Sequence, residues 1–194
     1  REIPIQVNDG GDGTIDDGDY FIFYGQSPHT WQYDTATAQF YHTNNIYSDY
    51  TYYFITNTAG IGEKKRVVTF NNAAMTANLT VNDYTHYDFY EVDQTNLSET
   101  GREWFGDLFD VTTTRSYTFS IPGYESGAGR LTASIAGVST TSSYMTIKVN
   151  QTTLGQQPLT PIGNQILATL NKGSFSFTPN ASTLTVTLDY NKPT

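Results

Sequence analysis

The stretch STLTVTLDY (residues 182–190) places apolar and polar side chains in strict alternation. Leu184, Val186 and Leu188 occupy every second position, and threonines separate them. Because successive side chains of a β-strand point to opposite faces of a sheet, this stretch predicts a strand with one face in a hydrophobic core. Threonine and valine are β-branched residues that favour strands, which agrees with this interpretation.

Three other stretches repeat this alternation: RSYTFSIP (115–122), GRLTASIAG (129–137) and SYMTIKVN (143–150). Together the four predict a two-sheet β-sandwich, jelly-roll-like, in which the alternate residues of every strand face one core. The residues expected to face this core in the three added strands are Tyr117, Phe119, Ile121, Leu131, Ala133, Ile135, Met145, Ile147 and Val149. Since 182–190 lies near the end of the sequence, we expect it at an exposed sheet edge, open to a strand from a longer parent protein.

The N-terminal half is rich in tyrosine and phenylalanine. Strands are predicted at DYFIFYG (19–25), TYYFIT (51–56), KKRVVTF (64–70) and THYDFYEVD (85–93), with a hairpin turn at NTAGIGE (57–63). After DQTNLSETGREWFGDLF (93–109), the sequence changes from this aromatic-rich composition to the alternation of apolar and polar residues described above. We therefore predict an all-β chain of two packed modules, 1–98 and 99–194. QQPLTPIGNQILATL (156–170) contains two prolines and is expected to be a long loop with at most one turn of helix.

Composition excludes several classes of function. Ten Lys and Arg against nineteen Asp and Glu give the 194 residues a net charge of −9, which repels phosphate backbones and anionic lipid, so no nucleic acid partner is expected. The absence of cysteine rules out a thiolate metal site and a cysteine nucleophile in this chain. No apolar run approaches the ~20 residues of a membrane-spanning helix, so no membrane insertion is expected.

The stretch VNDGGDGTIDDGDYFIFYG (7–25) crowds aspartates and glycines before an aromatic strand. When Asn8 is placed at position 1 of an EF-hand-like loop, Gly13 falls at position 6, where the loop turns sharply. Position 3 is Gly10, which has no side-chain oxygen to offer a metal. Calcium is therefore the one cofactor that the sequence suggests. The alternative is that these aspartates and glycines only build Asx-turns. The proposed calcium ligands are Asn8, Asp12, Thr14, Asp16 and Asp19, with Asp9 or Asp17 as substitutes.

No catalytic constellation is visible. The three histidines, His29, His42 and His86, are scattered, and neither H-E-x-x-H nor G-x-S-x-G occurs, so they are interpreted as packing or surface residues. Trp31 and Trp104 suit either core packing or a sugar-stacking platform.

Three blocks in this order resemble the N-terminal region of the PorU-type sortases of the type IX secretion system, relatives of the gingipain cysteine peptidases. The blocks are DGTIDDGDYFIFYGQSPHTWQYD (12–34), FYHTNNIYSDYTYYFIT (40–56) and SETGREWFGDLF (98–109). In that family of Bacteroidetes, β-rich modules precede a caspase-like peptidase domain that removes sorting signals from cargo and helps to attach cargo to a surface lipopolysaccharide. The residues shared with the family signature are Asp12, Gly13, Asp16, Gly18, Asp19, Tyr24, Gly25, Gly101, Arg102, Trp104, Phe105 and Gly106.

The resemblance implies a noncatalytic module, because a chain without cysteine cannot supply the nucleophile of such a peptidase. It implies a location outside the cytoplasm, at the outer membrane surface or secreted. Its expected partners are a downstream peptidase domain of the same parent protein and other surface proteins of the secretion system. Near the module boundary, the residues expected to make interdomain or partner contacts are Arg102, Trp104, Phe105 and Phe109. The alternatives are a surface carbohydrate-binding or adhesin module and a stand-alone hydrolase with an unrecognised carboxylate site.

Overall fold

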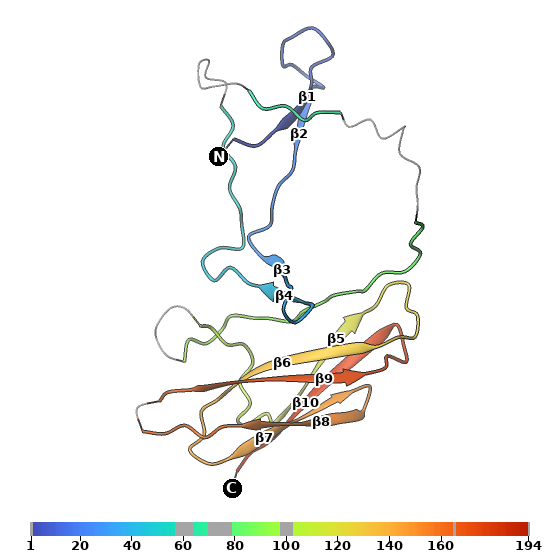
Figure 1. Ribbon diagram of the computed structural model, residues 1–194. Helices are drawn as coiled ribbons and strands as arrows, with labels where there is room; N and C mark the ends of the chain where they lie inside the picture. The colour runs from blue at the N-terminus through green and yellow to red at the C-terminus, as the bar shows by residue number, and fades with distance from the viewer. Residues whose placement is uncertain (1, 57–63, 70–78, 98–102, 165, 194) are drawn as a thin grey trace. The chain divides into compact units, whose positions relative to one another are not determined.

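The computed structural model of the chain describes residues 2–56, 64–69, 79–97, 103–164 and 166–193 (Figure 1). These residues form ten β-strands and no helix, which confirms the predicted all-β class. In the described part of the chain, therefore, no helix has the length and apolar character needed to cross a membrane. The chain divides into two compact units, Arg1–Thr85 and His86–Thr194.

The first unit begins with a short antiparallel pair. β1 (Ile5–Asn8) pairs with β2 (Tyr20–Phe23), and the aspartate-rich loop connects them. A segment far along the sequence runs beside β1, where the amide of Val67 donates to the carbonyl of Ile5 at 3.1 Å. The amide of Ile5 in turn donates to the carbonyl of Lys65 at 3.4 Å. This short parallel contact is the part of the predicted 64–70 strand that the structure shows.

The second pair in this unit is a hairpin of β3 (Thr30–Asp34) and β4 (Gln39–Thr43). Asp34 closes its turn by accepting bonds from the amide of Ala36 at 2.9 Å and from the hydroxyl of Thr37 at 2.7 Å. Ala38 then takes a left-handed backbone conformation, with φ of 53°. A turn followed by one left-handed residue is a common way to join two hairpin strands.

Several strand predictions in the N-terminal half are wrong. β2 lies within the predicted 19–25 strand, but residues 51–56 and 85–93 form no strand, and the predicted turn at 57–63 lies outside the described residues. Aromatic and β-branched content favours extended backbone, but a strand also requires a hydrogen-bonding partner, which local composition does not specify. β1, β3 and β4 are strands that the sequence interpretation missed.

The second unit contains the larger sheet. Its strand order is β5 (Thr114–Ser120), β10 (Thr183–Asn191), β7 (Ser143–Val149) and β8 (Thr152–Leu159), all antiparallel to their neighbours. A second sheet pairs β6 (Gly129–Gly137) with β9 (Thr169–Phe177), as Figure 1 shows. The stretch 156–170 contributes its first residues to β8 and its last to β9, so only the part between them is loop.

The core of this unit lies between the two sheets. Val149, Leu184 and Val186 are at most 7% exposed and come from the larger sheet. Partly buried apolar residues of both sheets, and Ile121 directly after β5, pack around them: Phe119, Ile121, Leu131, Leu154, Phe177 and Leu188. Leu131 and Phe177 belong to the smaller sheet, so the predicted two-layer packing and the inward-facing registers are confirmed.

One side of the sandwich is closed where β8 meets β9. Gln157 on β8 is 3% exposed, and its Nε2 donates to the carbonyl of Asn171 on β9 at 2.8 Å. A Cβ on Gly173 would come within 2.5 Å of the Gln157 side chain, so glycine permits this close approach. The two sheets therefore join along β8 and β9.

The predicted edge position of residues 182–190 is wrong, because β10 lies between β5 and β7 and is hydrogen-bonded to both. Its central place agrees with the burial of Leu184 and Val186, at 7% and 6% exposure. Alternation along one strand reports which face is buried and carries no information on how many neighbours the strand has.

The division into compact units falls N-terminal to the module boundary expected between residues 98 and 99. Residues 86–97 group with the second unit because Thr95 bonds Phe105 in both directions and Tyr90 bonds Asp107. The two compact units are defined by contacts within the folded chain, and such contacts do not show which segments fold independently. The modules 1–98 and 99–194 therefore stay a prediction.

Candidate functional site

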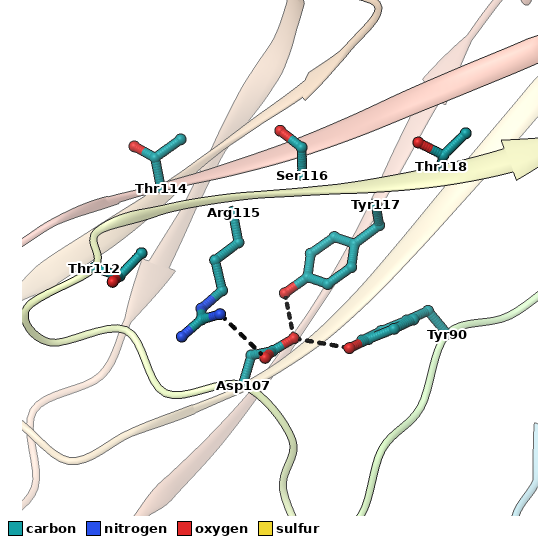
Figure 2. Close-up of a pocket in the computed structure, with 8 residues that line it drawn as sticks. All are labelled: Tyr90, Asp107, Thr112, Thr114, Arg115, Ser116, Tyr117 and Thr118. Atoms are coloured by element: carbon teal, nitrogen blue, oxygen red, sulfur yellow. Dashed lines mark hydrogen bonds and ion pairs between the residues drawn. The ribbon is translucent and has the colours of Figure 1, made fainter.

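A hollow of about 520 Å³ opens along β5 in the second unit (Figure 2). We refer to it as the Asp107 hollow. The lining residues come from β5, from the segment before it and from the extended segment around Tyr90: Tyr90, Asp107, Thr112, Thr114, Arg115, Ser116, Tyr117 and Thr118. Because they include consecutive β5 residues, the hollow follows the strand backbone itself.

Asp107 organises the hollow by accepting from three side chains. Its Oδ2 takes hydrogen bonds from the hydroxyls of Tyr117 at 2.9 Å and Tyr90 at 3.0 Å. Its Oδ1 lies 3.3 Å from a guanidinium nitrogen of Arg115, and the Asp107 side chain is only 16% exposed. Figure 2 shows the three donors converging on the carboxylate from β5 and from the Tyr90 segment. One carboxylate thus ties the segment before β5, β5 itself and residue 90 together.

Arg115 fixes the chain on the other side of Asp107. Its Nε and one terminal nitrogen donate to the carbonyl of Leu108 at 3.3 and 3.2 Å. Its guanidinium also lies 5.8 Å from the ring centroid of Phe109, within cation–π range. The planar guanidinium can serve these partners at once because its donors spread in a fixed fork. The Asp107–Phe109 stretch is therefore held against β5.

The two tyrosines of this network are kept protonated. Burial, together with the hydrogen bond to Asp107, raises the pKa of the Tyr117 phenol above its usual range. The hydrogen bond to Asp107 also raises the pKa of Tyr90. The one carboxylate among the residues that line the hollow, Asp107, is engaged by Tyr90, Tyr117 and Arg115. The geometry suits a positioning and binding role better than acid–base or nucleophilic chemistry.

Alkaline titration should expose the contribution of Tyr117. Its folded pKa is raised above the ordinary value of 10.0, so its contribution to stability is complete below about pH 10 and is lost as pH rises from there towards the folded pKa. Tyr117→Phe cannot titrate at this position. The stability difference between wild type and Tyr117→Phe, measured by urea unfolding from about pH 8 to 11, should therefore shrink above about pH 10. A constant difference across this range would show that the pKa of Tyr117 is not raised in the folded protein.

The predicted contact set around residues 102–109 has mixed outcomes. Arg102 lies outside the described residues. Trp104 is 39% exposed, and Phe105 donates its amide to the carbonyl of Thr95 at 2.7 Å. Gly106 permits the close approach of this segment, since a Cβ there would lie 2.8 Å from the carbonyl oxygen of Val92. Phe109 contacts Arg115, which is a lining residue of the Asp107 hollow. The interdomain role of Trp104 and Phe105 stays a prediction, as does any partner contact.

The aspartate-rich loop is built from local side-chain to backbone bonds. Asp9 accepts from the amide of Gly11 at 3.1 Å, and Asp12 accepts from the amide and hydroxyl of Thr14, each at 2.9 Å. Asp19 accepts from the amide of Asp16 at 2.9 Å. The bonds from Thr14 lower the pKa of Asp12. Gly10, Gly11, Gly13 and Gly18 have positive φ, so the glycines supply the left-handed turns between these bonds.

Calcium binding by this loop stays a prediction. Among the proposed ligands, Asn8 is the last residue of β1, and the others follow in the loop: Asp12, Thr14, Asp16 and Asp19. Among the described residues, no three His, Cys, Asp or Glu side chains lie close enough together to hold a metal ion. Calorimetric titration with calcium is predicted to give weak binding, with a dissociation constant of about 10⁻⁴ to 10⁻³ M, that is lost in Asp12→Asn/Asp16→Asn. Absence of heat from the wild type at high millimolar calcium would leave the aspartates as Asx-turn formers.

His29 and His42 make local contacts in the first unit. His29 accepts a hydrogen bond at Nδ1 from the amide of Asn45 at 3.0 Å, and its Nε2 lies 3.5 Å from Asp49. His42 contacts Trp31, with ring centroids 5.2 Å apart, on the same hairpin face as Tyr33 and Phe40. Trp31 is 41% exposed, so it is neither fully core nor fully open.

Sequence reasoning missed the residues that make the Asp107 hollow. Asp107 belongs to the GREWFGDLF stretch, but only the aromatic residues and the arginine of that stretch were expected to make contacts. Tyr117 was assigned correctly to the inner face of its strand. The available signal was an acidic residue within an aromatic segment just before a strand that carries both an arginine and a tyrosine on its inner face.

Comparison with known proteins shows a likeness at the level of the fold. No protein-family model matches the chain, and neither does any curated protein. Among solved structures, the chain is similar to the crystal structure of dimeric latent PorU from Porphyromonas gingivalis, with a TM-score of 0.74 and 20% sequence identity. The similarity covers 98% of this chain and 18% of the PorU chain. The likeness shows that the chain shares the fold of a part of PorU.

Proposed function

We propose that this chain is a noncatalytic β module of a PorU-type protein, which scaffolds a downstream cysteine-peptidase-like domain. The observation that carries this function is the fold likeness to part of PorU across 98% of the chain. Two sequence features support it: the order of the three resembling blocks, and the absence of the cysteine that such a peptidase requires. The same likeness favours a place outside the cytoplasm, at the outer membrane surface or in secreted form.

The role of the module in this account is mechanical. The Asp107 network ties Tyr90 and residues 107–109 to β5, and the core packs the two sheets together, so that the second unit offers a rigid body to a neighbouring domain. In the parent protein, the module would support secretion and surface attachment of cargo by positioning the peptidase-like domain. Other surface proteins of the secretion system are further candidate partners.

The open reading frame that encodes this chain tests the proposal first. It should continue into a domain with a Cys and His pair, and an in-frame deletion of residues 1–194 should reduce cargo attachment at the cell surface. Val186→Asp in the full protein should have the same effect, because it unfolds the second unit. A reading frame without such a domain, or normal attachment after the deletion, would contradict the scaffold function.

A carbohydrate-binding function is the second candidate, and the exposed aromatic face of the β3–β4 hairpin favours it. Trp31 and Tyr33 are 41% and 51% exposed and share this face. Sugar rings stack on such aromatic side chains through their apolar faces. Titration with surface polysaccharide while tryptophan fluorescence is followed should change the signal of the wild type and not that of Trp31→Ala, with Trp104→Phe as the control. Equal responses of wild type and Trp31→Ala would exclude this face as a platform.

A further inference from the structure

The free side of β5 is the least protected edge of the larger sheet. Among the described residues, β5 pairs along its length with β10 and with no other strand (Figure 1). The opposite side of the strand faces the Asp107 hollow, whose lining includes residues 114–118. An unpaired strand edge presents a row of amide and carbonyl groups to which another strand can bond.

The register shows which backbone groups face this edge. Tyr190 donates its amide to the carbonyl of Thr113 at 2.7 Å, and Ile121 donates to the carbonyl of Ser182 at 2.7 Å. In an antiparallel ladder, hydrogen-bonded pairs alternate along the strand, so Arg115, Tyr117 and Phe119 direct their backbone groups to β10. The residues between them, Thr114, Ser116 and Thr118, direct their amides and carbonyls outward. These three residues also line the Asp107 hollow.

The other edge of this sheet, β8, is protected in several ways. It contains Pro158, which lacks an amide donor, and its pairing with β7 has an irregular register at Ile147 and Lys148. β8 also contacts β9 through Gln157, which closes the sandwich on that side. β5 has neither proline nor lysine, and its single arginine is engaged by Asp107 and the carbonyl of Leu108. Proteins usually shield exposed edges, so an unshielded one indicates an interaction site.

The charge of the neighbouring segments indicates what kind of strand this edge would accept. Two wall residues of the Asp107 hollow, Tyr90 and Asp107, belong to segments 86–97 and 103–110. The charged side chains of these described segments are all acidic: Asp88, Glu91, Asp93, Glu103, Asp107 and Asp110. They outnumber the two cations that pair with them, Arg115 with Asp107 and Lys192 with Asp110. The net charge of the whole chain is −9. A peptide with positive side chains would be attracted to this side of the molecule, and an acidic one repelled.

We propose that β5 binds an extended basic peptide as an added strand. The peptide backbone bonds the outward groups of Thr114, Ser116 and Thr118, and its alternate side chains enter the Asp107 hollow beside Tyr90 and Tyr117. Backbone bonding supplies affinity in this mode, while the side-chain surroundings select the sequence. Lysine or arginine side chains add attraction to the acidic segments, so binding weakens as salt is raised. Strand addition at β5 goes beyond the scaffold function and does not require it.

Amide hydrogen exchange followed by nuclear magnetic resonance tests the proposal on the full chain. The probe is a nine-residue peptide of alternating threonine and lysine with blocked ends, and its control replaces lysine by glutamate. At a lysine-peptide concentration of about ten times its dissociation constant, exchange at Thr114, Ser116 and Thr118 should slow roughly tenfold. Arg115 and Tyr117 should not change, because their amides already bond β10. The glutamate peptide should leave all five amides unchanged.

Two variants at one position separate backbone from side-chain recognition. Ser116→Pro removes the outward amide and should abolish binding of the lysine peptide, while Ser116→Val keeps that amide and should bind as the wild type does. If Ser116→Pro does not fold, the exchange pattern of the wild type decides by itself. The proposal is overturned if the lysine peptide leaves Thr114, Ser116 and Thr118 unprotected, if protection appears at other strands instead, or if the glutamate peptide binds equally well.

Discussion

Val186→Asp should unfold the second unit at room temperature. Val186 is 6% exposed at the centre of the core, on the middle strand of the larger sheet. A buried carboxylate without a partner costs roughly 3–5 kcal/mol, and the lost valine packing adds about 1–2 kcal/mol. Because a typical domain is stable by only about 5–15 kcal/mol, most or all of its stability would be lost. Circular dichroism and thermal melting measure the effect.

Thr183→Asp is the matched control for this change. Thr183 lies on the same strand but is exposed, so a carboxylate there remains hydrated. It should shift stability by about 0.5 kcal/mol or less. If Val186→Asp melts at the wild-type temperature, or if both variants unfold alike, the inward register of β10 is wrong.

Asp107→Ala should lower the stability of the second unit by about 2–3 kcal/mol. The change removes the acceptor of two tyrosine hydroxyls and the partner of Arg115. Hydrogen bonds to a charged group contribute about 1.5–3 kcal/mol, but the Arg115 side chain is 35% exposed, so solvent reduces its share. Urea unfolding gives the loss of free energy. Limited proteolysis should also cut faster within residues 86–97 and 103–109, because Asp107 ties Tyr90 and its own segment to β5.

Asp110→Ala provides the comparison. Asp110 pairs with Lys192, but the two side chains are 56% and 51% exposed. Such surface pairs contribute about 0–1 kcal/mol, so this variant should remain close to wild type in stability and in proteolysis. Equal losses from Asp107→Ala and Asp110→Ala would show that the Asp107 network does not hold the segment in place.

The sandwich was predictable because its information is local. In RSYTFSIP and SYMTIKVN, every second residue is apolar, and the structure buries those residues in the predicted register. Period-two alternation directly encodes which face of a strand meets the core. The aromatic segments 51–56 and 85–93 lack this clear alternation, and the structure assigns no strand to either. High β-propensity without a specified partner was a misleading signal there.

The place of β10 in its sheet and the set of residues that line the Asp107 hollow both depend on contacts between residues that lie far apart in the sequence. β10 pairs with β5 and with β7, which lie far from it in sequence, so alternation in 182–190 did not reveal its central place. Tyr90, Asp107 and Tyr117 meet only after the segment before β5 folds back along that strand. Tyrosine and aspartate are common in this chain, so neither the spacing nor the type of these three residues set them apart from the other tyrosines and aspartates. The aspartate-rich loop has the more distinctive sequence, but its bonds in the structure are local turns.

Hydrogen exchange of the free protein tests the central structural claim, that β10 is the middle strand and β5 an open edge. Along β10, the amides of Val186, Thr187 and Leu188 should all exchange slowly, because alternate residues bond β5 and β7. Along β5, slow and fast amides should alternate, with Arg115, Tyr117 and Phe119 slow and Thr114, Ser116 and Thr118 fast. Alternating exchange in β10, or uniform protection of β5, would contradict this account.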